Sequence, residues 1–341
     1  MPILGLNLQQ QPLDANTAKF ISISNLLAGI QDFAQGGNLD PNINLESAQK
    51  IFAKAAQRPR TLTPAAKQML RISWHTELAA RILDNVLDAS GTVPDPDLLA
   101  TLRRVSAQTL PVQVYYAIFN SSRCFTLVVG SPCTTHAQVH KDFGNRARGA
   151  PGPWGVTLKG DPENTSSCIF TPVMSGDISF NPMERGHLPK EYLGLALRMT
   201  RRWQIEFRRA DWLKDSSHRT SKGEPYKVLP KRGRDEILGR LRPTTLLDLV
   251  YELRRRTNYE SADEYGSDAD DAAVARFHSG LLYLLDSCLL IYEAELARYI
   301  GVSTYLETAK EWRDSLGRMN DRALRAFDAR TRTIQEAAST V

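Results

Sequence analysis

The stretch that decides the fold is VYYAIFNSSRCFTLVVGSPCTTHAQVHKDF, residues 114–143. Its first half is apolar on nearly every helical face, which is typical of a helix at the centre of a bundle. Gly130 is expected to end this helix, since glycine reaches the backbone angles that stop one. Thr135 and Gln138 then form a capping box, which predicts a second helix directly after them.

Helical periodicity continues through most of the chain and predicts a mainly α fold. Thr63 with Pro64 marks a helix start, and Pro111 is expected to end the helix that precedes the decisive stretch. Residues 144–190 are rich in Gly, Pro, Asn and Ser and predict an irregular insertion with room for a small β-hairpin. The expected helices cover 16–34, 45–57, 63–90, 95–110, 112–129, 190–213, 244–256, 271–299 and 303–335.

The composition is that of an ordinary globular protein, with 42% hydrophobic and 24% charged residues in 341. Four widely spaced cysteines without a Cys-x-x-Cys pair fit thiols in a reducing compartment better than a disulfide framework. The start of the sequence has no signal-peptide pattern, and the apolar run GLLYLLDSCLLIY is short and carries Asp286. We therefore expect a cytoplasmic protein that does not bind membranes.

Two stretches resemble the HEPN superfamily, helical bundles of bacterial toxin–antitoxin and antiviral systems. In the first, YYAIFNSSRCFTLVVGSPCTTHAQVHKDF at 115–143, a Tyr-Tyr-Ala-x-Phe helix precedes a glycine turn and a Thr-His helix start. The second, LVYELRRRTNYESADEYGSDADDAAVARFHSGLLYLL at 249–285, is similar to the later part of that bundle. The resemblance implies a HEPN-like bundle with extra helices at both ends, interrupted by a large basic insertion.

This resemblance implies a domain layout as well as a fold. The layout is an N-terminal helical region at 1–110, a split bundle at 111–143 and 245–300, an insertion at 144–244 and a C-terminal helix at 301–341.

Active members of the family are metal-independent ribonucleases, in which an arginine stands four to six residues from a histidine. Here Arg256 matches the family arginine and Asn258 follows it, but Asp263 or Tyr265 stands where the histidine is expected. The implied catalytic set is therefore Arg256, Asn258 and Asp263, with an atypical proton donor. The resemblance implies no metal ion and no other cofactor.

Arg123 interrupts the buried helix and admits two interpretations, because a desolvated guanidinium needs an anionic partner. One is an internal ion pair with Asp263 or Asp286. The other is a polar pocket in which Asn120, Arg123, Arg256 and Asn258 together meet an RNA phosphate.

A basic segment from Arg198 to Arg242 contains fourteen Lys and Arg against six Asp and Glu, although the whole chain carries only +5. Helical spacing predicts an arginine-rich face at 192–210, which suits either plain solvation or phosphate binding. The opposite, apolar face is expected to contain Tyr192, Leu195, Ala196, Met199, Trp203 and Phe207. The residues expected to contact nucleic acid are Asn120, Arg123, Arg198, Arg201, Arg202, Arg208, Arg209, Lys231 and Arg232.

Two further patterns are interpreted as packing features. His136 and His140 lie on one helical face, but a third metal ligand is missing, so metal binding is only a minor alternative. Apolar residues at heptad spacing in 305–326 predict packing of the last helix on the chain itself, with self-association as the alternative.

The sequence thus favours a nucleic-acid-binding protein of a bacterial defence or toxin–antitoxin system, with RNA favoured over DNA. If it is an enzyme, we expect a metal-independent endoribonuclease. The alternative is a non-catalytic helical scaffold in a larger protein complex, and a homodimer is a further expected assembly.

Overall fold

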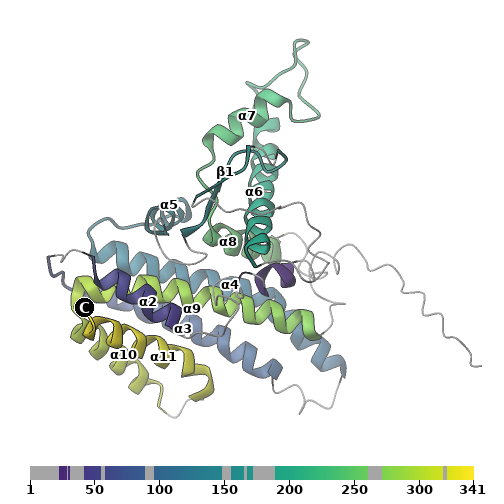
Figure 1. Cartoon of the computed structure of the whole chain (residues 1–341). Coiled ribbons are helices and arrows are strands. Elements are labelled where there is room, and N and C mark those ends of the chain that lie inside the picture. Colours follow the sequence, from purple (N-terminus) through teal and green to yellow (C-terminus); the bar gives the residue numbers. More distant parts are fainter. Residues whose placement is uncertain are drawn as a thin grey trace, which may run out of the picture.

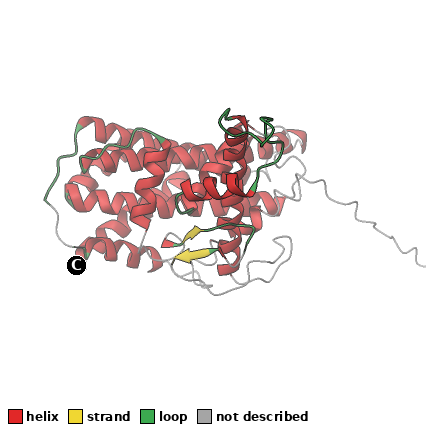
Figure 2. Cartoon of the chain, turned by 90° about the horizontal axis from the view of Figure 1, so that it is seen from above, coloured by secondary structure: helices red, strands yellow, loops and turns green. Residues whose placement is uncertain are grey.

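The computed structural model describes residues 23–28, 30, 42–54, 58–88, 96–147, 155–164, 167–171, 189–259, 271–317 and 321–341. These residues are largely helical, and their one sheet has two short strands (Figure 2). The mainly α fold predicted from periodicity is therefore confirmed, together with a small β element inside the insertion.

The bundle is built on three long helices, α3 (Pro64–Asp88), α4 (Pro96–Val128) and α9 (Asp271–Ile300). They lie side by side, and α2 (Asn42–Phe52), α10 (Val302–Ser315) and α11 (Asp321–Ser339) cover them (Figure 1). The core sits between these helices and includes Trp74, Tyr115, Phe277 and Trp312, all almost fully buried. By length and composition alone α9 could cross a membrane, but 72% of its most apolar window is buried inside the protein, as in a core helix.

A second group of elements stands on one side of the bundle. It comprises α5 (His136–Ala147), β1 (Thr157–Lys159), β2 (Ile169–Thr171), α6 (Pro189–Lys214), α7 (Lys231–Arg240) and α8 (Leu246–Tyr259). The strands pair antiparallel, with Leu158 opposite Phe170. The end of α6, the following loop and α7 project away from the bundle as an arm (Figure 1), which has a small core of its own around Ile205, Trp212 and Ile237.

Several predicted helix ends are confirmed by their hydrogen bonds. The backbone N–H of Ala66, two residues after the start of α3 at Pro64, donates to Thr63 Oγ1 at 3.3 Å. The capping box before α5 is reciprocal, because Thr135 N donates to Gln138 Oε1 at 3.0 Å and Gln138 N donates to Thr135 Oγ1 at 3.3 Å. Gly130, with a φ of 79°, follows the end of α4.

Two predicted helix boundaries are wrong. Pro111 was expected to end a helix, but α4 continues through it from Pro96 to Val128. Packing of both neighbouring turns against α3 and the core outweighs the one backbone hydrogen bond that proline removes. The single helix expected at 303–335 is two helices, since Gly317 adopts a φ of 60° after α10 and α11 begins at Asp321.

The two helices of this C-terminal pair pack on the chain itself, as predicted. Tyr305, Ala309 and Trp312 of α10 and Ala323 of α11 are buried in the main core. The faces expected for α6 are partly wrong, because Phe207 is 53% exposed whereas Arg201, expected on the basic face, is only 2% exposed. Leu193, Leu197 and Ile205 form the buried side of α6, along with Ala196 and Thr200.

Candidate functional site

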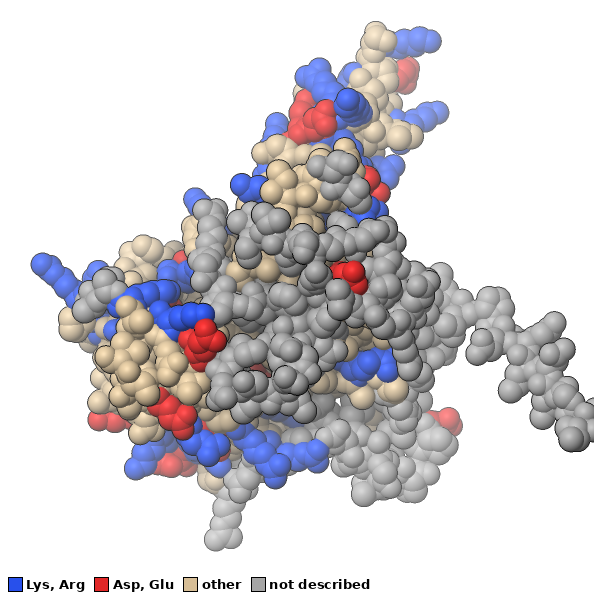
Figure 3. All heavy atoms as spheres, viewed as in Figure 1, with Lys and Arg blue, Asp and Glu red and all other residues tan. Residues whose placement is uncertain are grey.

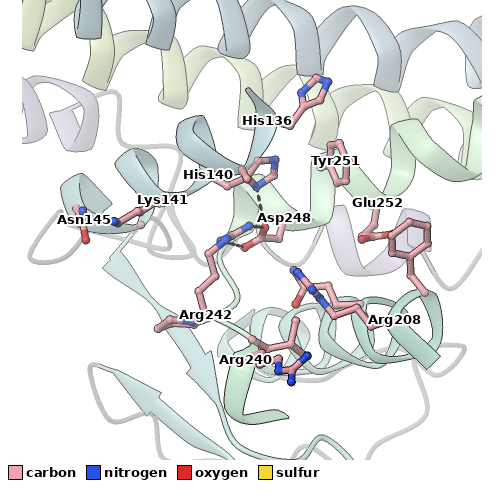
Figure 4. A pocket seen from close by; sticks show the side chains of 16 residues that line it. His136, His140, Lys141, Asn145, Arg208, Arg240, Arg242, Asp248, Tyr251 and Glu252 are labelled. Atoms are coloured by element: carbon pink, nitrogen blue, oxygen red, sulfur yellow. Dashed lines mark hydrogen bonds and ion pairs between the residues drawn. The ribbon is translucent and has the colours of Figure 1, made fainter. Parts of the chain in front are cut away.

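A cavity of about 530 Å³ opens where α5, α6, α8 and the segment 240–243 meet (Figure 4). This volume lies within the range of pockets that hold nucleotide-sized ligands. Each wall comes from a different part of the sequence, so the cavity exists only because the insertion folds back on the bundle. Its floor carries a chain of four hydrogen-bonded polar side chains.

Asp248 is the buried end of that chain. It stands third in α8, where its Oδ2 accepts hydrogen bonds from the backbone N–H of Thr245 at 2.8 Å and from the Thr245 hydroxyl at 2.9 Å. Arg242 donates through both terminal nitrogens, one of them to Oδ2 at 2.9 Å. Burial alone would raise the pKa of the Asp248 carboxyl, but His140 and Arg242 hold it well below its usual range, so it stays ionised.

His140, Tyr115 and His136 carry the chain from Asp248 toward the cavity. His140 Nδ1 lies 2.7 Å from Asp248 Oδ1, and the Tyr115 hydroxyl lies 3.3 Å from His140 Nε2 and 2.7 Å from His136 Nδ1. Burial, then the nearby Arg254 charge and His140, lower the pKa of His136, and burial raises the pKa of Tyr115. His136 is therefore a neutral imidazole at the cavity wall around pH 7.

Arg254 lies behind this chain in an aromatic setting. Its guanidinium carbon is 4.9 Å from the ring centre of Tyr116, 5.3 Å from that of Tyr115 and 5.7 Å from that of Tyr251. It donates to the Tyr116 hydroxyl at 2.7 Å. Within the described ranges this buried guanidinium has no carboxylate partner, so it leaves positive potential near His136.

The mouth of the cavity is positively charged. Lys141, Arg208 and Arg240 line it, are exposed, and form no ion pair with any described residue. Figure 4 shows Arg208 and Arg240 on one side of the cavity and Lys141 on another. Three cations without ion-pair partners in the described chain line the same cavity as a neutral histidine, which makes the site suited to an anionic ligand.

The predicted pocket of Asn120, Arg123, Arg256 and Asn258 does not coincide with this cavity. Arg123 lies 5.7 Å from the ring centre of Phe119 on its own helix, and Asn120 donates to the Tyr116 carbonyl at 2.8 Å. The Arg256 guanidinium carbon lies 4.2 Å from the ring centre of Trp203 on α6. The arginine of α8 that meets the Tyr-Tyr helix is Arg254, two residues earlier and hence on another side of the helix.

Asp263 and Tyr265 lie outside the described residues, as does the side chain of Asn258. The ion pair proposed between Arg123 and Asp286 is wrong, because Asp286 is paired with Arg81 and Arg330.

Most arginines expected to contact nucleic acid are occupied by the protein itself. Arg201 is buried and donates to the carbonyls of Gly160 at 2.6 Å and Arg242 at 3.1 Å, so it joins the hairpin to α6. Arg198 donates to the Pro162 carbonyl. The ion pairs are Arg202 with Glu163, Arg209 with Glu206 and Arg232 with Glu236.

Arg208 alone among the predicted contacts lines the cavity. Lys231 is exposed at the start of α7 and forms no ion pair with a described residue. In Figure 3 many of the visible Lys and Arg side chains gather on the projecting arm.

Sequence reasoning missed His140, Asp248 and Arg242 as members of one site. The sequence does contain one indication of this site. Thr245 and Asp248, three residues apart, form a capping pattern like the one before α5. Pairing that pattern with His140 requires the tertiary fold. The interpretation of His136 and His140 as packing or surface residues is incomplete, since both line the cavity.

Among the described residues no group of three or more His, Cys, Asp or Glu side chains is arranged to hold a metal ion. No protein family, curated protein or solved structure significantly matches this chain.

Proposed function

We propose that the protein binds single-stranded RNA, with a backbone phosphate held at the mouth of the cavity by Arg208, Arg240 and Lys141. The observation that carries the proposal is that these three cations surround the cavity without ion-pair partners in the described chain. Guanidinium groups pair with phosphate oxygens through two parallel hydrogen bonds, and lysine adds a point charge. Exposed cations of the arm, such as Lys231, extend the surface along which a strand can run.

An unpaired strand fits this cavity better than a duplex does. The cavity is recessed, and its wall carries the aromatic rings of Tyr251 and Phe207, on which an unstacked base can lie. The side of a regular double helix offers no free base to such a recess. The resemblance of 115–143 and 249–285 to the HEPN superfamily supports RNA over DNA, and a bacterial defence or toxin–antitoxin setting in the cytoplasm remains part of the proposal.

A second candidate function is metal-independent cleavage of the bound RNA, and the four-residue chain favours it. Ionised Asp248 fixes the proton of His140 on Nδ1, so His140 Nε2 accepts from the Tyr115 hydroxyl. The Tyr115 oxygen then accepts from His136 Nδ1, which leaves a lone pair on His136 Nε2. In this role His136 takes the proton of a ribose 2′-hydroxyl as its oxygen bonds to phosphorus and the bond to the 5′-oxygen breaks. Water protonates the leaving 5′-oxygen.

Binding is tested with a fluorescent single-stranded RNA at two salt concentrations. The wild type should show a steep loss of affinity with salt. The double variant Arg208→Ala/Arg240→Ala should bind about tenfold or more weakly, with a salt slope lower by about two. Arg332→Ala, an exposed arginine on α11 without an ion pair in the described chain, is the matched control and should bind like the wild type. Absence of binding by the wild type in dilute salt would refute the proposal.

Cleavage is tested separately, by incubating the same RNA with a chelator present. The wild type and Arg332→Ala should produce fragments, and His136→Ala should bind the RNA but leave it intact. Intact RNA with the wild type would leave binding as the function and remove the second candidate.

A further inference from the structure

We infer that the cavity selects guanine, which Gln204, Phe207 and Glu252 recognise through complementary hydrogen bonds and stacking. This inference rests on the proposed RNA binding and names the base that the same site takes. Gln204 and Phe207 lie one turn apart on α6, and Glu252 on α8 also lines the cavity. In Figure 4 the Glu252 carboxyl group lies beside an aromatic ring on the wall of the cavity.

The amide of Gln204 is oriented by its neighbours. Arg201 Nη1 donates to the Thr244 hydroxyl at 3.2 Å, and arginine can only donate. The Thr244 hydroxyl therefore donates its own hydrogen bond to Gln204 Oε1, which lies 2.8 Å away. With its oxygen occupied in this way, Gln204 presents Nε2 as a donor, and this nitrogen has no acceptor among the described residues.

Glu252 supplies the complementary acceptor. Its side chain is only 5% exposed, and its Oε2 accepts from Arg255 Nε at 2.9 Å. Oε1 accepts no hydrogen bond from the described part of the chain. A carboxyl group is out of place in a cavity that only holds phosphate, because it repels the anion. Burial also raises the pKa of Glu252, which shows that the ionised group lacks full compensation here.

Phe207 supplies a stacking surface for the same ligand. The Arg255 guanidinium carbon lies 4.7 Å from the centre of its ring, and Arg255 also bonds Glu252, so the ring and the carboxyl group are neighbours. The side chain is nevertheless 53% exposed, which is high for a phenylalanine of a folded chain. A base placed on the open face of the ring continues a stack that Arg255 begins.

Guanine matches this set of groups better than the other bases. Its N1–H and its 2-amino group are adjacent donors for the Glu252 carboxylate, and its O6 is an acceptor for Gln204 Nε2. Adenine lacks the N1–H donor, and cytosine and uracil are smaller and present one donor each on this edge. A cavity of about 530 Å³ accommodates one nucleotide with its phosphate at the cationic mouth.

The test uses the full chain and four labelled oligouridines that differ only in one central residue, which is G, A, C or U. We expect the wild type to bind the G-containing oligomer about tenfold more tightly than the others. Glu252→Gln should abolish that preference, so that the variant binds all four oligomers with equal affinity. Glu206→Gln, an exposed carboxyl on α6 outside the cavity lining, is the matched control and should keep the preference. An inosine substitution, which removes only the 2-amino group, should give an intermediate affinity.

The outcomes separate this inference from the proposed function. Tight, salt-dependent binding of all four oligomers with equal affinity overturns guanine selection and leaves RNA binding standing. A guanine preference that survives in Glu252→Gln, in a variant whose unfolding temperature matches the wild type, also overturns it. Failure of every oligomer to bind refutes RNA binding, and guanine selection with it.

Discussion

Two buried polar networks in this molecule each contain carboxyl and tyrosine side chains, and they differ in whether they are closed. One joins α3, α9 and α11 through Glu77, Glu293 and Arg330. The other is the chain from Asp248 through His140 and Tyr115 to His136. The first is closed in the sense that its charged groups, together with Arg81 and Asp286, pair with one another, whereas the second ends at the cavity.

The closed network leaves nothing for a ligand. Arg330 donates to both Glu77 oxygens, at 3.0 and 2.6 Å, and to Glu293 Oε2 at 2.9 Å. Trp74 Nε1 donates a hydrogen bond to Glu293 Oε1 at 2.9 Å, and the Tyr305 hydroxyl donates one to Glu293 Oε2 at 2.6 Å. A fully satisfied set of this kind holds the C-terminal helices to the bundle. The open network instead presents a histidine to a cavity whose lining includes three cations without ion-pair partners among the described residues, which is why we assign function to it.

The largest effect is expected when the closed network is broken. Arg330→Met leaves the carboxyl groups of Glu77 and Glu293 buried without their shared cation, and we expect a loss of about 3–5 kcal/mol in the free energy of unfolding. Urea denaturation at pH 7 measures this loss. Arg332→Ala, on the same helix but exposed, should change the free energy by less than about 0.5 kcal/mol. A loss under 1 kcal/mol for Arg330→Met would mean that the network contributes little to stability.

The open network should contribute stability in a pH-dependent way. Asp248→Asn removes the ionised partner of His140 and Arg242, and we expect a loss of about 2–3 kcal/mol at pH 7. The pKa of Asp248 is lower in the folded than in the unfolded chain, so its contribution is present above about pH 5 and is lost as the pH falls. The difference between wild type and variant should therefore shrink between about pH 5 and pH 2. Urea denaturation of both proteins across this pH range measures the difference. A difference in unfolding free energy that stayed constant with pH would contradict an ionised Asp248 in the folded chain.

A smaller effect is expected at the link between the two histidines. Tyr115→Phe keeps the packing but removes the hydroxyl that lies 2.7 Å from His136 Nδ1 and 3.3 Å from His140 Nε2. We expect a loss of about 1–2 kcal/mol in stability. An NMR titration should show that the pKa of His136 differs between the variant and the wild type. Titration curves unchanged from the wild type would show that the hydroxyl does not couple the two rings.

The sequence was sufficient for the features set by local chemistry. The capping box before α5, the turn at Gly130 and the α-helical class each depend on residues a few positions apart, and all three are confirmed. Pro111 was misjudged because its local penalty is outweighed by packing on α3, which no local pattern reveals. At Gly317 the local effect prevailed instead. Its left-handed backbone conformation ends α10, although the heptad pattern predicted one continuous helix.

The candidate site shows where sequence reasoning stops. The Tyr-Tyr helix and α8 pack together, and Arg254 of α8 donates a hydrogen bond to Tyr116, whereas the arginine singled out from the sequence, Arg256, stacks on Trp203. One turn of a helix holds both positions, so only the rotation of α8 about its axis decides between them. Likewise, the charge of the α6 arginines was visible in the sequence, but not that Arg201 would be consumed by two carbonyl groups of the insertion.

The smallest effect is expected at an exposed ion pair on α6, which allows a paired surface arginine to be compared with an arginine at the cavity. Arg202 pairs with Glu163 at 2.7 Å, and the two side chains are 42% and 52% exposed. Arg202→Ala should change the free energy of unfolding by no more than about 0.5 kcal/mol, because solvent screens such a pair. It should also leave RNA affinity within about twofold of the wild type, whereas Arg208→Ala, six residues further along α6, lowers it severalfold. Fluorescence anisotropy with one labelled RNA measures both variants side by side. Equal weakening by Arg202→Ala and Arg208→Ala would mean that an arginine already held in an ion pair can still bind phosphate. The cavity would then not be the specific phosphate-binding site of α6.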